Sequence, residues 1–98
     1  MADPVFGILL TSTTADEASD PLDRTAYERT VFQQVQSGTS VITEIQARID
    51  PAGAWATIGV LNGNAMLLVD GPYGAFRAVR DSTTTAIVVY FRSDRYTL

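Results

Sequence analysis

The feature that most limits the fold is an alternation of apolar and polar side chains with a period of two. It is clearest at residues 40–50 (SVITEIQARID). Val41 and Ile45 fall on one face of an extended chain, while Glu44 and Arg48 fall on the other. This pattern is typical of a strand with one buried face and one solvated face. The segment therefore predicts a half-buried antiparallel strand.

Further strands are predicted where β-branched and aromatic runs are bounded by turn residues. The expected strands are residues 54–61, 64–69, 75–80 and 84–92. A helix is an alternative at residues 25–37, but Val31, Phe32 and Val35 favour a strand there. The sum is an all-β fold, a small antiparallel β-sandwich of six to eight strands with an extended N-terminal segment.

Turn residues predict how these strands connect. Asp50 to Gly53 should join strands 40–50 and 54–61 in a hairpin, and Gly59 indicates a bulge or a close backbone approach. Asn62-Gly63 suits a tight type I′ turn into a returning strand. Ser37-Gly38-Thr39 and Asp81-Ser82-Thr83 have the composition of two further hairpin turns.

The N-terminal part differs in composition from the rest, which predicts a division into residues 1–25 and a sandwich body at residues 26–98. Residues 11–25 are too polar to bury much surface, whereas the first ten residues are apolar. The apolar candidates for partner binding are Val5, Phe6, Ile8, Leu9 and Leu10. They could form an arm that pairs with another subunit, or simply the first strand of their own sandwich.

Composition excludes several classes of function. The chain has no cysteine and no histidine, so it lacks thiol nucleophiles, the commonest general base and the commonest metal ligands. Eleven acidic residues against seven arginines give a net charge of −4, which does not suit nucleic acid. No apolar run approaches the roughly 20 residues of a membrane helix. We expect no enzyme activity, cofactor, metal, nucleic-acid partner, membrane span or export signal.

A few side chains could carry recognition. Asp16, Glu17, Asp20 and Asp23 cluster in sequence, but the segment lacks the fixed spacing and burial that catalysis or calcium binding needs. Trp55 is expected to pack in the core or at the turn, with a stacking platform as the alternative.

Two arginines and a tyrosine complete the candidates. Arg77 and Arg80 have odd spacing, so one must point inward and need several acceptors, either Glu44 or backbone carbonyls. Tyr73, in Gly71-Pro72-Tyr73-Gly74, could point outward for recognition or close one end of the sandwich.

The order of these signals over residues 40–91 resembles two groups of proteins. One is the small β-sandwich virion proteins of tailed bacteriophages, on Asp50, Gly53 and Trp55 and then on the GPYGAFRA stretch at 71–78. The other is the galactose-binding-like (discoidin-type) domains, although the long sugar-contacting loops of those domains are missing here.

The phage resemblance implies a non-enzymatic virion structural protein, a capsid decoration (cement) subunit located in the virion and assembled in the host cytoplasm. Its implied partners are further copies of itself, as a trimer, and the major capsid protein or another virion protein. Tyr73 and Arg77 join the apolar N-terminal residues as candidate partner-binding residues. The alternatives are a tail or head-tail connector accessory protein, and a carbohydrate-binding module using Trp55, Tyr73 and Arg77.

Overall fold

The computed structural model describes residues 5–23, 29–71 and 73–94, and this part of the chain contains strands and no helix. The strands are β1 (Val5–Ser12), β2 (Leu22–Asp23), β3 (Arg29–Gln36), β4 (Ile42–Arg48), β5 (Ala56–Asn62), β6 (Ala65–Asp70), β7 (Ala75–Arg80) and β8 (Ile87–Asp94). They confirm the all-β prediction and, at β3, the choice of strand over helix.

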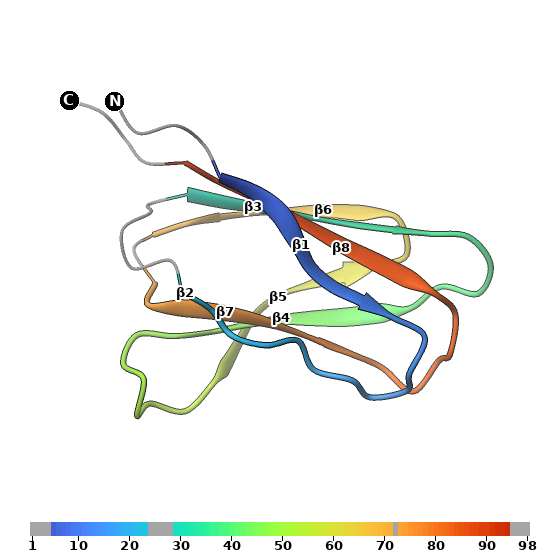
Figure 1. Cartoon of the computed structure of the whole chain (residues 1–98), viewed down its shortest axis with the longest axis horizontal. Helices are drawn as coiled ribbons and strands as arrows, with labels where there is room; N and C mark the ends of the chain where they lie inside the picture. The colour runs from blue at the N-terminus through green and yellow to red at the C-terminus, as the bar shows by residue number, and fades with distance from the viewer. Residues whose placement is uncertain (1–4, 24–28, 72, 95–98) are drawn as a thin grey trace.

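Two four-stranded antiparallel sheets pack face to face, with strand orders β1-β8-β3-β6 and β2-β7-β4-β5. The pairs β1–β8, β2–β7, β3–β6 and β4–β5 are those of one long hairpin, whose tip lies between β4 and β5. Rolling that hairpin adds the pairs β3–β8 and β4–β7, each of which joins two strand pairs into one four-stranded sheet. This is the strand order of a jelly roll. Figure 1 shows β1 beside β8 in the upper layer and β7 beside β4 in the lower one.

One of the four predicted hairpins is confirmed. β4 and β5 pair directly, with a register shift opposite Gly59 that matches the predicted bulge. The other three predicted turns were wrong as hairpins, because β3 and β4, β5 and β6, and β7 and β8 lie in different sheets. Gly38 and Gly63 do adopt positive φ, at 99° and 66°. The turns are tight, but they carry the chain from one sheet to the other.

The core fills the space between the sheets with the inward side chains of both. Phe32 of β3 and Phe76 of β7 meet across the layers with ring centroids 5.2 Å apart, in an edge-to-face arrangement. Fully buried side chains from both layers surround them, among them Ile45, Leu61, Ile87 and Val89. Alternation along each strand therefore produces one shared core and two outer faces.

Two large polar side chains inside the sandwich, Arg80 and Gln34, donate hydrogen bonds to backbone carbonyls. Arg80 is 2% exposed, and its guanidinium donates to the carbonyls of Ser12 and Thr85 at 2.7 Å and also to that of Thr83. Of the two acceptors expected for an inward arginine, the structure uses carbonyls. Gln34 is also fully buried and donates to the carbonyls of Val41 and Gly63.

β1 is the outer strand of the sheet β1-β8-β3-β6, with partners along all of β8. Its register shifts between Ile8 and Leu10, so that Leu9 is the additional residue of a bulge. Of the two arrangements considered for the N-terminal residues, the structure has the first strand of the chain's own sandwich. β1 and β2 thus belong to the same sandwich as the strands beyond residue 26.

Candidate functional site

The outer face of the sheet β1-β8-β3-β6 is the candidate site. Strand register arranges its side chains in rows across the sheet, which we call the apolar face. One row is Phe6, Arg92, Val31 and Leu68, and the next is Ile8, Tyr90, Gln33 and Met66. A third row contains Thr11, Val88 and Val35. Apolar side chains dominate all three rows, although they point away from the core.

Exposure marks this face as unusual. Phe6 is 65% exposed, Ile8 58% and Met66 68%, and Leu68, Tyr90 and Val35 are each more than 40% exposed. Six of the nine large apolar side chains that are exposed in the described residues lie here. Contiguous apolar surface on a small protein is a mark of an interaction site, whereas scattered single residues are not.

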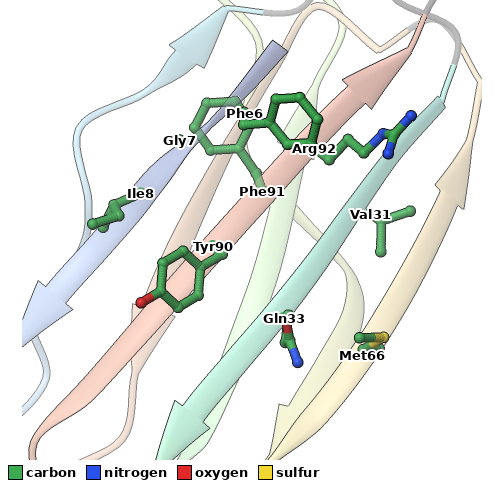
Figure 2. Close-up of a pocket in the computed structure, with 9 residues that line it drawn as sticks. All are labelled: Phe6, Gly7, Ile8, Val31, Gln33, Met66, Tyr90, Phe91 and Arg92. Atoms are coloured by element: carbon green, nitrogen blue, oxygen red, sulfur yellow. The ribbon is translucent and has the colours of Figure 1, made fainter. Parts of the chain in front are cut away.

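The face is hollowed into a groove of about 540 Å³. In Figure 2, Phe6, Ile8 and Tyr90 lie on the β1–β8 side of the groove, and Met66 lies across β3 from them. Gly7 also lines the groove, and its missing side chain is explained by the ring of Phe91, which would lie 2.7 Å from an added Cβ. The close packing of Phe91 beneath β1 therefore requires glycine at that position.

Charged groups are confined to one end of the apolar face, where Asp94, Arg29 and Asp70 align in a single row. Arg29 and Asp70 form an ion pair at 2.9 Å, and Arg92 pairs with Asp94 at 3.2 Å. The guanidinium of Arg92 also lies 5.0 Å from the ring centre of Phe6. The two arginines and two aspartates cancel, so the described residues of the face carry no net charge.

The predicted N-terminal binding residues divide between the two sides of β1. Phe6 and Ile8 point outward onto the apolar face. Val5 and Leu9 are partly buried against the core because they alternate with Phe6 and Ile8, and the bulge shifts this alternation so that Leu10 is buried as well. Among the five, Phe6 and Ile8 are therefore the residues whose side chains lie on the apolar face.

The outer face of the sheet β2-β7-β4-β5 is more polar, and its side chains contact one another. Glu44 accepts a hydrogen bond from Thr57, and Arg77 donates to the side chain of Gln46 at 2.7 Å. The guanidiniums of Arg48 and Arg77 lie 4.3 Å and 4.8 Å from the ring centre of Trp55. Such cation–π contacts hold both arginines against the sheet.

Of the two packings expected for Trp55, the structure does not have the one in the core. The residue follows the β4–β5 turn, precedes β5 and is half-buried against two arginines on the outer face. Tyr73 instead packs inward, with its ring 5.6 Å from that of Phe76. The structure therefore does not bring Tyr73 and Trp55 together, and a sugar site made from both with Arg77 has no common surface.

The acidic residues that cluster in sequence are dispersed along the edge of the second sheet. Asp16, Asp20 and Asp23 are exposed and Glu17 is half-buried. Within the described ranges, no group of three or more acidic side chains is placed to hold a metal ion. Those ranges also hold no helix of the length and apolar character that crossing a membrane requires.

Sequence reasoning missed the β6 and β8 side of the site, which is formed by Met66, Leu68 and Tyr90. A signal for it was present, since Ala65–Asp70 (AMLLVD) is apolar at both alternating sets of positions. A strand that is apolar on both faces needs a cover on both faces. In this chain the core covers one face of β6, and nothing within the described residues covers the other.

No family model matches the sequence, and no curated protein is similar to it. The fold, in contrast, is shared with solved structures. The SPBc2 prophage-derived protein YomS aligns over 93% of this chain and 92% of its own, with a TM-score of 0.77 and 14% identity. The PBSX exported protein XepA aligns over 96% of this chain, with a TM-score of 0.66 and 18% identity.

The chain spans 38% of XepA, so the similarity there is to one part of a larger protein. A protein of the disulfide-linked pili that form Bacillus endospore appendages also aligns, over 96% of this chain and 87% of its own. Its TM-score is 0.50 and its identity 13%. All three similarities concern the fold, and one of the three proteins, YomS, is prophage-derived by name.

Proposed function

We propose that this protein is a non-enzymatic structural subunit of a phage particle, and that it assembles with other protein subunits through the apolar face. The observation that carries the proposal is the apolar surface on the sheet β1-β8-β3-β6, where Phe6, Ile8 and Met66 are more than half exposed. The shared fold with YomS and XepA supports a phage origin.

Assembly through this face needs no chemistry beyond burial. Removing apolar surface from water contributes roughly 25 cal/mol per Å², so covering several large side chains gives a favourable contact. The ordering cost is small, because the face lies on paired strands and not on loops. Repetition of one contact around a symmetric particle then multiplies its effect.

The more specific form of the proposal is a capsid decoration, or cement, subunit that bridges capsid proteins. A small rigid sandwich suits this role, because it can lie over a junction between capsid proteins without inserting into it. A tail or head-tail connector accessory protein would use the same surface, so the position in the particle separates the two.

The test is to locate the chain in particles of the phage or prophage that encodes it. A version tagged beyond residue 98 is expressed during particle production, and purified particles are imaged with a gold-labelled antibody. The proposal predicts label on particles, and label on heads supports the decoration role. Label on tails would support the tail accessory role instead of the decoration role. Unlabelled particles would contradict a structural function.

A substitution connects this assay to the face. Ile8→Arg places a charge on the apolar face at the edge strand β1, whereas Val60→Arg places the same charge at an exposed apolar residue on the opposite sheet. Ile8→Arg should lose incorporation into particles and Val60→Arg should keep it. The reverse result would mean that the protein assembles through the outer face of the sheet β2-β7-β4-β5.

A further inference from the structure

The charge distribution of the apolar face suits contact with an identical copy. Two chains with a net charge of −4 repel each other overall, so self-association requires a surface on which charge cancels. The apolar face is such a surface, because its arginines and aspartates form the pairs Arg29–Asp70 and Arg92–Asp94 within the chain. The unbalanced acidic residues lie elsewhere, as at Asp16, Asp20 and Asp23.

The shape of the face also fits a two-fold contact. Phe6 and Ile8 form an exposed ridge on the edge strand β1, and the groove lies beside them over β8, β3 and β6. In an isologous dimer each copy offers the same patch, so the ridge of one copy can enter the groove of the other. Two stacked sheets packed in this way lie about 10 Å apart with interdigitated side chains.

We infer that the apolar face binds the apolar face of a second copy of this chain, giving a two-fold dimer of sandwiches stacked sheet on sheet. The inference deepens the proposed function, on which it rests, by naming the first partner of that face. A hydrophobic ligand in the groove and a different protein are the occupants that the experiments below would reveal instead.

The face is small for a specific interface. Eight-residue strands are about 27 Å long and four strands are about 19 Å across, so the plan area is about 500 Å². Standard specific interfaces cover about 800 Å² on each partner. The dimer should therefore be reversible, with a dissociation constant in the micromolar range, as weaker interfaces are.

Sedimentation velocity of the purified full chain tests self-association. Over about 5 to 500 µM, a range around the expected micromolar constant, the wild type should change from monomer to dimer. Ile8→Arg should weaken the dimer by at least about 30-fold, the effect of losing one hot-spot contact, and Val60→Arg should dimerise as the wild type does. Met66→Arg is a second variant in case Ile8→Arg fails to fold. A wild type that stays monomeric throughout would overturn the inference.

Crosslinking tests the geometry, and the natural absence of cysteine makes it simple. Gln33 lies in the middle of the apolar face on β3, between Tyr90 and Met66. Gln33→Cys should be joined into dimers by a short bismaleimide, and Val60→Cys should not. If the copies instead extended the sheet by pairing their uncharged β1 edges, Gln33→Cys would not crosslink, and the stacked dimer would be wrong.

The particle assay distinguishes failure of this inference from failure of the proposed function. A monomeric wild type whose Ile8→Arg variant is excluded from particles would contradict self-pairing and keep the structural role with a different partner. A monomeric wild type whose Ile8→Arg variant enters particles normally would contradict both. A groove occupied by a hydrophobic ligand, detected by native mass spectrometry of the wild type, would also contradict the dimer.

Discussion

The two outer faces of this sandwich are built from the same alternating pattern but differ in how far their outward side chains are exposed. On the sheet β2-β7-β4-β5, outward side chains contact one another, as Arg77 does with Gln46 and with Trp55. On the sheet β1-β8-β3-β6, Phe6, Ile8 and Met66 point outward with more than half of their surface exposed.

The difference indicates what each face does. The polar face is complete within one chain, because its hydrogen bonds and cation–π contacts are made across neighbouring strands. The apolar face contributes little to folding while it is exposed, so the free energy of covering it is available for assembly. A partner should therefore contact the apolar face first.

The largest effect on the free energy of unfolding is expected inside the sandwich, where a substitution should destabilise both sheets. Arg80 lies on β7 and donates to the carbonyl of Ser12 on β1, which belongs to the other sheet. Arg80→Met leaves several buried carbonyls without a donor and should lower the free energy of unfolding by about 3 kcal/mol. Urea unfolding measures it. Arg77→Met, on the outer face, is the matched control, and an equal loss in both variants would contradict the inward role of Arg80.

A smaller effect is expected from the polar face alone. Trp55→Ala removes a half-buried ring and the two arginine contacts upon it, which should cost about 1 to 2 kcal/mol. Thermal unfolding gives the value. A loss of about 3 to 5 kcal/mol, the range for a fully buried aromatic side chain, would mean that the ring belongs to the core after all.

A pH-dependent effect should appear where the connection after β7 meets β4. The pKa of Asp81 is lowered chiefly because its carboxylate accepts a hydrogen bond from the backbone of Ile42, with further help from Thr83, while desolvation opposes the shift. A lowered pKa stabilises the fold above the ordinary value near 4, and this contribution is lost as the pH falls through the folded pKa. Asp81→Asn should therefore be less stable than the wild type in urea at neutral pH, by less than the Trp55 variant. The free energies of unfolding of the two proteins should become equal in acid. A difference that persists in acid would mean that packing, and not the charge of Asp81, causes the loss of stability.

The smallest effect on the isolated chain is expected on the apolar face itself. Tyr90→Ser and Met66→Ser replace exposed side chains, so each should change the free energy of unfolding of the monomer by no more than about 0.5 kcal/mol. Dilute samples unfolded in urea give this value. A much larger loss in the monomer would mean that the face stabilises its own fold, and would remove the contrast between the two faces.

Strand positions could be predicted from the sequence because side-chain alternation is a local property, and β4, β5 and β8 begin and end close to the expected residues. Strand pairing could not be predicted, because a turn such as Asn62-Gly63 can connect two strands of the same sheet or two strands of different sheets. The tip of the rolled hairpin, β4–β5, is the place where neighbours in sequence are also neighbours in the sheet. The remaining pairs join segments far apart in the chain, and local residue patterns do not encode them.

The candidate site was half predictable for a similar reason. Phe6 and Ile8 could be selected as candidates because they stand in an apolar run beside a polar stretch. The bulge at Leu9, after which Leu10 points inward instead of outward, depends on the register with β8. Met66 and Tyr90 join Ile8 in one row only after β8 and β3 are placed between β1 and β6.

The reactivity of a single engineered thiol in the assembled state tests the central claim most directly. Gln33→Cys reports on the apolar face and Val60→Cys on the opposite one, in a chain that has no other cysteine. Alkylation rates are compared between dilute monomer and phage particles that carry each variant. Assembly should slow the reaction sharply at Gln33→Cys and leave Val60→Cys unchanged, because a packed interface excludes the reagent. Protection of Val60→Cys with Gln33→Cys still fully reactive would contradict the central claim.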